Sequence, residues 1–149
     1  MNYAEQRAAA FEALLVRLAA DAGIARVTAD TVDELASRHE LLALIYTGEP
    51  ARSPESWDVC VVLPELLATC AGLAGAILDP AESARAAARF GIDKLPALVV
   101  LRRGAYVGVV EGMRDWLPFV DELGRLAQAP SQPPPVAGQY PAHRATRSA

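Results

Sequence analysis

The chain has 149 residues, 52% hydrophobic and 21% charged, which fits one globular domain and excludes a wholly disordered protein. Its formal net charge is −4, but Arg144 and Arg147 are the only charged residues after Arg125, so residues 1–128 carry a net charge of −6. This acidic body argues against a nucleic-acid partner and favours a basic one. No apolar stretch reaches the ~18 residues of a membrane span and the N-terminus lacks a secretory signal, so we expect a cytoplasmic protein without membrane insertion.

The first forty residues predict a helix, a short strand and a second helix. Apolar residues recur at helical spacing from Tyr3 to Ala20, and the next apolar segment, Ile24–Val27, is a short strand candidate. Thr31 is followed three residues later by Glu34, the pattern of a capping box. The pattern predicts a helix from Val32 to Arg38.

The middle of the chain predicts a central strand, a polar loop and a kinked helix. Leu41–Tyr46 is an uninterrupted apolar run, which is typical of a strand covered on both faces. Thr47–Ser56 is a polar loop, and Trp57–Cys70 reads as a helix interrupted at Pro64. A proline inside a helix removes a hydrogen bond and kinks the axis.

The next segments predict one more strand and helix and then a hairpin. Ala74–Leu78 is the strand, and a helix from Ala81 to Phe90 follows it. Two further apolar runs, Ala97–Leu101 and Tyr106–Val110, are joined by a short turn that contains Gly104. Such a pair of runs is typical of a β-hairpin.

The chain is predicted to end in a helix and a proline-rich tail. The helix runs from about Arg114 to Gln128, with an apolar stripe made of Trp116, Phe119, Val120 and Leu123. Residues 129–149 are rich in proline and poor in apolar side chains, so we expect them to be disordered, without stable contacts after about residue 130. The folded domain is therefore expected to span residues 1–128.

The order of these elements predicts an α/β fold with a mixed central sheet flanked by helices. Strand–helix–strand units give parallel pairing, and the closing hairpin is antiparallel. The stretch from Phe90 to the last helix, including Leu95-Pro96 and Glu111-Gly112, resembles the C-terminal half of thioredoxin. The resemblance implies a thioredoxin-like fold with a cis peptide bond before Pro96. It also places Ser56 and Val59 at the two redox cysteine positions, so the redox motif is absent.

The sequence offers little other catalytic chemistry. Cys60 and Cys70 fall in one predicted helix, where ten residues rise roughly 15 Å, too far apart for a disulfide. Both are expected to be small buried residues, although a redox role for Cys60 alone stays open. His39 and His143 are isolated, and no metal-ligand cluster, phosphate loop or Ser/His/Asp set is present. We expect no cofactor and no enzymatic activity.

A second resemblance is to the hydrogenase-1 expression proteins, the HyaE/HupG/HoxO group. It is carried by an ordered set of short phrases over about residues 10–127: Arg52-Ser53-Pro54-Glu55, Glu65-Leu66-Leu67, Phe90-Gly91, Leu95-Pro96-Ala97, the glycines around Tyr106 and the Trp116 helix. The resemblance implies a cytoplasmic chaperone that binds the twin-arginine signal peptide of the NiFe-hydrogenase small-subunit precursor before export. Other hydrogenase accessory proteins are further candidate partners.

The thioredoxin resemblance also implies a peptide-binding surface, because in that fold the residue before the cis proline offers backbone hydrogen bonds to an extended peptide. Here that residue is Leu95, beside Pro96, and the pairing would be a short β-augmentation. We expect Trp57, Gly112 and Met113 around it, with Trp57 as an apolar contact or simply a packed aromatic residue. The acidic residues expected to ring this surface are Glu55, Asp58, Glu111 and Asp115; solvated charge is the simpler explanation for each alone.

Three functions remain open from the sequence. The first is a non-enzymatic chaperone for an arginine-bearing signal peptide, which accounts for the missing thiols, the Pro96 loop and the acidic body together. The second is an atypical thiol–disulfide oxidoreductase that uses Cys60. The third is an inert thioredoxin-like scaffold within a larger assembly.

Overall fold

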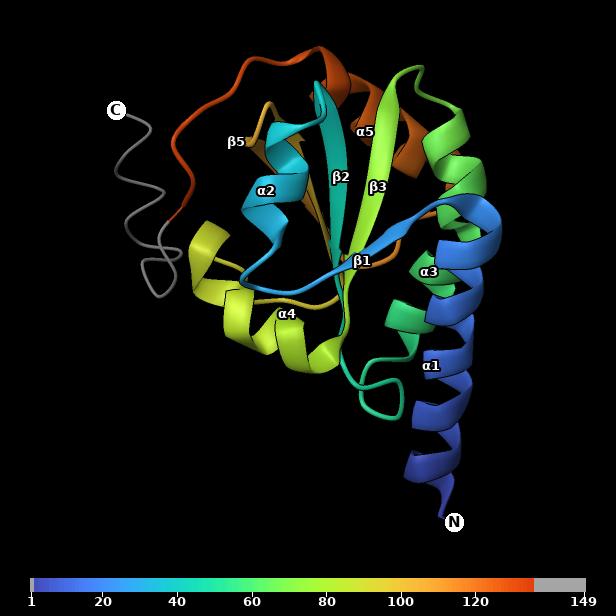
Figure 1. The fold of residues 1–149 in the computed structure, drawn as a ribbon. Coiled ribbons are helices and arrows are strands. Elements are labelled where there is room, and N and C mark those ends of the chain that lie inside the picture. Colours follow the sequence, from blue (N-terminus) through green and yellow to red (C-terminus); the bar gives the residue numbers. More distant parts are fainter. Residues whose placement is uncertain (1, 136–149) are drawn as a thin grey trace.

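The computed structural model describes residues 2–135 and contains five α-helices, one 3-10 helix and five strands within them (Figure 1). Along the chain these are α1 (Tyr3–Ala22), β1 (Ala25–Val27), α2 (Val32–Ser37), β2 (Leu41–Tyr46), α3 (Pro54–Ala68), β3 (Leu73–Leu78), α4 (Pro80–Ala86), the 3-10 helix η1 (Ala87–Phe90), β4 (Ala97–Arg102), β5 (Ala105–Glu111) and α5 (Trp116–Gln128). Every strand predicted from the sequence is present.

The five strands form one mixed sheet in the order β1-β3-β2-β4-β5. The first three are parallel to one another, with Leu41 of β2 opposite Leu73 of β3. β4 runs antiparallel to β2, and β5 runs antiparallel to β4. The predicted α/β fold, with a parallel front half and a closing hairpin, is confirmed.

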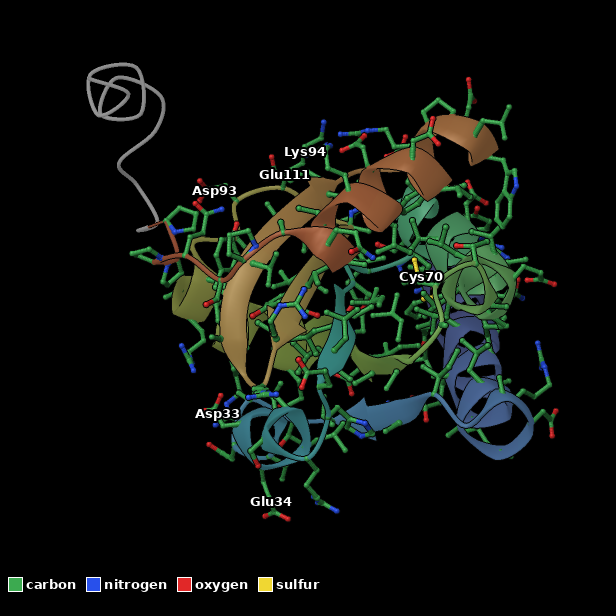
Figure 2. All side chains as sticks on the ribbon, turned by 90° about the horizontal axis from the view of Figure 1, so that it is seen from above. Asp33, Glu34, Cys70, Asp93, Lys94 and Glu111 are labelled. Carbon is green, nitrogen blue, oxygen red and sulfur yellow. The ribbon has the colours of Figure 1, made fainter. Side chains whose placement is uncertain are left out.

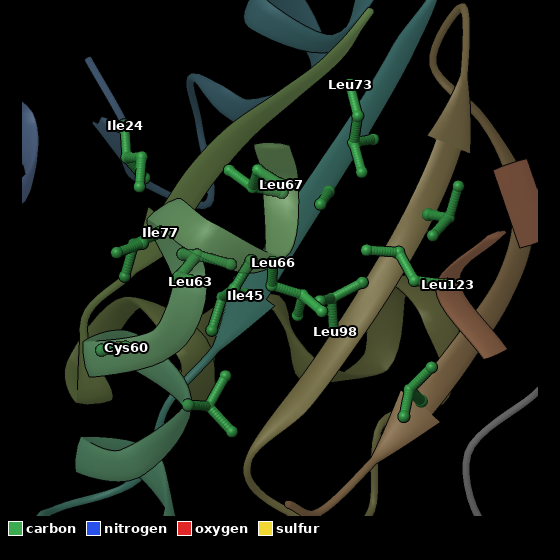
Figure 3. Packing of buried hydrophobic residues seen from close by; sticks show 14 of the residues in the cluster. Ile24, Ile45, Cys60, Leu63, Leu66, Leu67, Leu73, Ile77, Leu98 and Leu123 are labelled. Atoms are coloured by element: carbon green, nitrogen blue, oxygen red, sulfur yellow. The ribbon is translucent and has the colours of Figure 1, made fainter. Parts of the chain in front are cut away.

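Helices cover both faces of the sheet. Residues 41, 43 and 45 of β2 pack with α1, α3 and α5, whereas residues 42, 44 and 46 pack with α2 and the α4–η1 segment. Figure 1 shows the two layers on opposite sides of the strands, and Figure 3 shows Leu63, Leu66 and Leu67 of α3 against Ile45 and Ile77 of the sheet. Because successive side chains of a strand point to opposite faces, a strand covered on both sides must be apolar throughout.

The first turns of α1 and α2 are stabilised in different ways. α1 begins with a capping box, in which Asn2 accepts from the N–H of Glu5 and the Glu5 carboxylate accepts from the N–H of Asn2. The capping box predicted for α2 is wrong. The hydroxyl of Thr31 instead accepts from the N–H of Thr28, and the Thr28 carbonyl accepts from the N–H of Val32. A local Ser/Thr turn therefore competes successfully with the cap.

Two predicted helix boundaries also move. α3 starts at Pro54 instead of Trp57, because proline is well suited to the first helical position, where its missing N–H has no partner to lose. The helix predicted to run unbroken from Ala81 to Phe90 starts at Pro80 and tightens into η1 after Ala86.

The C-terminal segment departs from the prediction. The backbone N–H of Gln132 donates to the carbonyl of Tyr106 at 2.7 Å, and the Gln132 side-chain amide donates to the carbonyl of Val107 at 2.9 Å. The expectation that residues after about 130 make no stable contacts is therefore wrong for Gln132. The rest of the predicted tail, residues 136–149, lies outside the described residues.

Candidate functional site

In the first turn of α3, a buried serine occupies the position that matches the first redox cysteine. Ser56, at the position matching the first redox cysteine, is fully buried, and its hydroxyl accepts from the N–H of Gly48 at 2.9 Å. The hydroxyl of Ser53 lies 2.8 Å from that of Ser56. Val59, at the second position, is 2% exposed and packs in the core. These positions therefore join the preceding loop to the helix and present no reactive group.

Neither cysteine lies at either of the two positions that match the redox cysteines. Cys60 is fully buried in α3, and burial raises the pKa of its thiol to about 12. At neutral pH such a thiol is almost entirely protonated, and the thiolate is the nucleophilic form. Cys70 lies beyond the end of α3, and both cysteines are free. The geometry disfavours a redox role for Cys60.

The loop before β4 keeps the backbone arrangement that the sequence predicted. The Leu95–Pro96 peptide bond is cis, and the carbonyl of Pro96 accepts from the N–H of Gly112 at 2.7 Å. Leu95 is 37% exposed, and within residues 2–135 neither its N–H nor its carbonyl has a hydrogen-bond partner. These two groups are available to an extended chain.

Three segments of the chain meet around Gly112. The carboxylate of Glu55, in the first turn of α3, accepts from the N–H of Met113 at 3.4 Å. Gly112 has a positive φ of 77°, and a Cβ atom there would lie 3.6 Å from the Glu55 carboxylate and 3.7 Å from Cε of Lys94. The start of α3, the Pro96 loop and the β5–α5 loop are thus in contact.

An open groove lies beside this junction. Its volume is about 470 Å³, and it is lined by Arg52, Ser53, Pro54, Glu55, Asp93 and Leu95. Gly48 lies behind Leu95, and a Cβ atom at Gly48 would come within 2.9 Å of Cβ of Ser53 and 3.3 Å of a Leu95 methyl group. A larger residue at position 48 would therefore disturb the wall of the groove.

The structure brings together Glu55, Leu95, Pro96, Gly112 and Met113 from the predicted peptide-binding set. It does not bring Trp57 to them through any described contact. The Trp57 ring packs 6.0 Å from the ring of Phe11 in α1, and the Arg7 guanidinium lies 4.9 Å above it. Trp57 thus contacts α1, as in the packed-aromatic interpretation.

The remaining predicted residues lie around the junction at varying exposure. Asp58 is exposed on α3, and Asp115 is exposed at the N-terminal end of α5, where its side chain makes no capping hydrogen bond. Glu111 is half-buried, and its carbonyl accepts from the Arg114 guanidinium. The side chain of Arg114 also pairs with Glu122 at 3.0 Å.

Sequence reasoning missed the basic residues of this surface. Lys94 and Arg52 lie among the predicted acids, so the ring has mixed charge instead of being uniformly acidic. Figure 2 shows Asp93, Lys94 and Glu111 on one side of the molecule. Lys94 is next to Leu95 in the sequence, so its position could have been inferred from the loop assignment.

Two apolar residues at the start of α5 are exposed. Trp116, a member of the predicted apolar stripe of α5, is 43% exposed, and Leu117, which lies outside that stripe, is 70% exposed. Phe119 and Leu123 do form the buried stripe. Trp116 and Leu117 begin the helix that follows the Met113 loop.

Other kinds of site find no support in the part of the chain that the structure describes. Residues 2–135 contain no group of three or more His, Cys, Asp or Glu side chains that could hold a metal ion. None of the described helices is long and apolar enough to cross a bilayer.

Comparison with known families connects the chain to hydrogenase expression proteins. The family model of hydrogenase-1 expression protein HyaE matches residues 14–119. The hydrogenase expression/formation protein HoxO of Cupriavidus necator is 38% identical over 130 residues, which cover 84% of this chain and 80% of that protein. HupG of Bradyrhizobium diazoefficiens is 34% identical over 113 residues, covering 72% and 76% of the two chains.

Solved structures give the same family and the wider fold. A crystal structure of a hydrogenase expression/formation protein HupG from Rhodopseudomonas palustris matches with a TM-score of 0.50 and 30% identity, covering 69% of this chain and 94% of that one. A thioredoxin from Halobacterium salinarum matches with a TM-score of 0.58 and 22% identity, covering 73% and 93%. The second likeness confirms the thioredoxin-like fold alone.

Proposed function

The chain belongs to the family of hydrogenase-1 expression protein HyaE, and from this we propose that it is a non-enzymatic chaperone in NiFe-hydrogenase maturation. Family membership gives the broader role, an accessory function in hydrogenase expression and formation. The narrower role is that it binds the twin-arginine signal peptide of the small-subunit precursor, in the cytoplasm, before export. Other hydrogenase accessory proteins are candidate additional partners.

One observation supports the proposal: the loop at Leu95 and Pro96 has the backbone arrangement that a peptide-binding thioredoxin-like site needs, whereas the two redox positions carry Ser56 and Val59. Leu95 offers an unbonded N–H and carbonyl next to a cis proline and an open groove. Ser56 and Val59 are buried where redox thiols would lie. A site of this kind can hold an extended chain through backbone hydrogen bonds but cannot exchange disulfides with it.

Apolar side chains near the groove supply a second source of affinity. Leu95, Trp116 and Leu117 are all substantially exposed, and Met113 is half-buried beside the Glu55 carboxylate. Methionine and aromatic side chains adapt to varied apolar partners. The apolar part of a signal peptide would bury surface against them, a contribution that salt does not screen.

Charge supplies a third contribution, favourable but modest. Glu55, Asp58, Glu111 and Asp115 attract a twin-arginine motif, whereas Lys94 and Arg52 oppose it. Exposed charges are screened over ~8 Å at physiological ionic strength. Affinity for the arginine-bearing peptide should therefore fall as salt rises without disappearing.

The test is a titration of the purified full chain with a synthetic signal peptide, with and without its two arginines, at low and high salt. Tighter binding of the arginine-bearing peptide at low salt, converging with the other peptide at high salt, is the expected result. Equal affinity for both peptides at every salt concentration would show that the acidic residues do not contribute to binding of the arginines. No binding to either would overturn the signal-peptide proposal and leave the scaffold interpretation.

Charge reversal locates the binding surface. Asp58→Lys and Glu111→Lys should slow association with the arginine-bearing peptide and leave dissociation nearly unchanged, because peripheral charges mainly steer encounter. Glu65→Lys, also an exposed reversal on α3 but in its second half, is the matched control. If Glu65→Lys slows association as much as Asp58→Lys, only net charge matters and the binding surface lies elsewhere.

A further inference from the structure

The two edges of the sheet are protected in different ways. β1 is an edge of only three residues, and its middle residue is Arg26. β5 is the opposite edge, seven residues long, and Ala105–Val110 carries no charged side chain. Long, uncharged, β-prone edge strands tend to pair with other chains, and short or charged edges resist this. β5 lacks both of these protections.

The outward-facing groups of β5 follow from its pairing with β4. The N–H of Gly112 donates to the carbonyl of Pro96, so the backbone groups of Gly112 face β4. In an antiparallel pair, the backbone groups of successive residues point alternately toward and away from the partner strand. Those of Glu111 and Val109 therefore point away from β4. The register shifts where Val100 and Leu101 face Gly108 and Tyr106, leaving Val107 as an extra residue. The bulge accounts for two consecutive carbonyls, those of Tyr106 and Val107, being reached from the open edge.

A single residue of the C-terminal segment binds both carbonyls. Gln132 uses its backbone N–H for Tyr106 at 2.7 Å and its side-chain amide for Val107 at 2.9 Å. The beginning of the segment is held by Arg102, whose guanidinium donates to the carbonyls of Ala127 and Ala129 at 2.7 and 3.0 Å. The segment that starts at Ala129 is thus attached to the β4–β5 hairpin at two points.

The composition of this segment makes it a poor template for a further strand. Proline occupies positions 130, 133, 134 and 135, and proline has no N–H to donate to a ladder. A segment that satisfies β5 but offers few donors of its own ends the sheet instead of extending it.

We propose that residues 129–135 form an edge strap, a built-in cover that keeps β5 from pairing with β5 of a second copy of this chain. The second copy is the expected occupant because the uncharged β5 segment is itself a β-prone strand that presents the same open edge. The inference does not depend on signal-peptide binding.

The test uses sedimentation velocity of full-length variants across a wide concentration range. Gln132→Pro removes the backbone N–H and the side-chain amide together, and Ser131→Ala, at an exposed neighbouring residue, is the matched control. Pairing of β5 with β5 needs the strap of both copies to open, so each dimer gains from four neutral hydrogen bonds that the variant no longer has to break. Relative to the wild type, Gln132→Pro should therefore self-associate roughly a thousandfold more tightly, equivalent to about 4 kcal/mol per dimer. Gln132→Ala keeps the backbone N–H and should show a smaller shift.

Adding Ala105→Lys to Gln132→Pro identifies the interface. Ala105 is exposed at the start of β5, and a lysine on an edge strand opposes pairing, so the double variant should sediment as the wild type does. Folded Gln132→Pro that sediments like the wild type at every concentration overturns the proposal. Association that Ala105→Lys does not reverse overturns it too, since another surface is then responsible. If Gln132→Pro fails to fold, Gln132→Ala replaces it, and wild-type sedimentation of Gln132→Ala likewise overturns the proposal.

Discussion

The hydroxyl of Ser56 accepts a hydrogen bond from the backbone N–H of Gly48 at 2.9 Å, and both residues are buried. This contact fixes the loop between β2 and α3 to the first turn of the helix. It lies behind Leu95, because a Cβ atom at Gly48 would approach a Leu95 methyl group within 3.3 Å. The position that carries a redox thiol in thioredoxins here supports the wall of the candidate groove.

Ser56→Ala should therefore destabilise the protein. The substitution leaves the buried N–H of Gly48 without a partner, which costs about 1–3 kcal/mol of unfolding free energy. Urea denaturation followed by circular dichroism measures the change. Ser53→Ala is the matched control, because Ser53 is only half-buried and water can replace its hydroxyl. Equal stability of the wild type and Ser56→Ala would show that the contact contributes nothing.

The two thiols should react at very different rates. Burial raises the pKa of Cys60 to about 12 and also shields it, so a thiol reagent should modify it only after unfolding. Cys70 is half-buried and should react in the folded protein. A Cys70→Ser variant isolates Cys60 for this measurement. Fast modification of Cys60 in that folded variant, or measurable insulin reduction by the wild type, would restore the redox interpretation.

Leu95→Ser should weaken binding of the signal peptide with little effect on folding. Removing a half-exposed leucine from the groove loses about 1 kcal/mol of apolar contact, which corresponds to roughly a fivefold loss of affinity. Isothermal titration calorimetry would measure it. Val16→Ser, at an exposed valine in the second half of α1, is the control and should leave affinity unchanged. Equal losses in both variants would place the peptide elsewhere.

Acid should weaken the attachment of α1 to the sheet. Arg26 donates to both carboxylate oxygens of Glu12, and these hydrogen bonds hold the pKa of Glu12 below its usual value. Burial opposes the shift at Asp79, but hydrogen bonds from the Glu82 N–H and from Arg26 still lower its pKa. A carboxylate with a lowered folded-state pKa stabilises the protein above its unfolded pKa and loses this contribution as pH falls through the folded value.

Glu12→Gln isolates the first of these pairs. At neutral pH the variant should lose about 0.5–1 kcal/mol of unfolding free energy, a small effect because the Glu12 side chain is 54% exposed. As the pH falls through the lowered pKa of Glu12, the wild-type carboxylate is itself protonated, so the two proteins should converge toward acidic pH. Urea denaturation across this range is the measurement. A difference that stays constant with pH would mean that packing, not charge, explains it.

The fold could be predicted from the sequence because its apolar residues follow patterns typical of helices and of covered strands. The apolar run Leu41–Tyr46 requires cover on both faces, and that requirement fixed the layers. The site was predictable where a backbone motif carried it, as at Leu95 and Pro96. Side-chain direction was not predictable there: Trp57 turns toward Phe11 and Arg7 because a helix, α1, offers it a surface that no local pattern reveals.

Prediction from composition was wrong where a single residue makes contacts that its neighbours do not make. Residues 129–135 look disordered because prolines dominate, yet Gln132 has two donors that match two carbonyls exposed by a bulge in β5. Likewise, Trp116 fits the apolar spacing of α5 but lies in its first turn, beyond the core that Phe119 and Leu123 fill. Such outcomes depend on tertiary geometry, which spacing along the chain does not encode.

Trp57 packs against Phe11 of α1 with its ring tilted, which makes it an optical reporter for the attachment of that helix. The chain has only two tryptophans, and the other, Trp116, is 43% exposed at the start of α5, the helix that follows the Met113 loop. A peptide that covers the groove should shift Trp116 emission to shorter wavelength and leave Trp57 emission unchanged. Detachment of α1 should instead change the Trp57 signal, so Trp57→Phe and Trp116→Phe variants would let fluorescence separate client binding from loosening of the N-terminal helix.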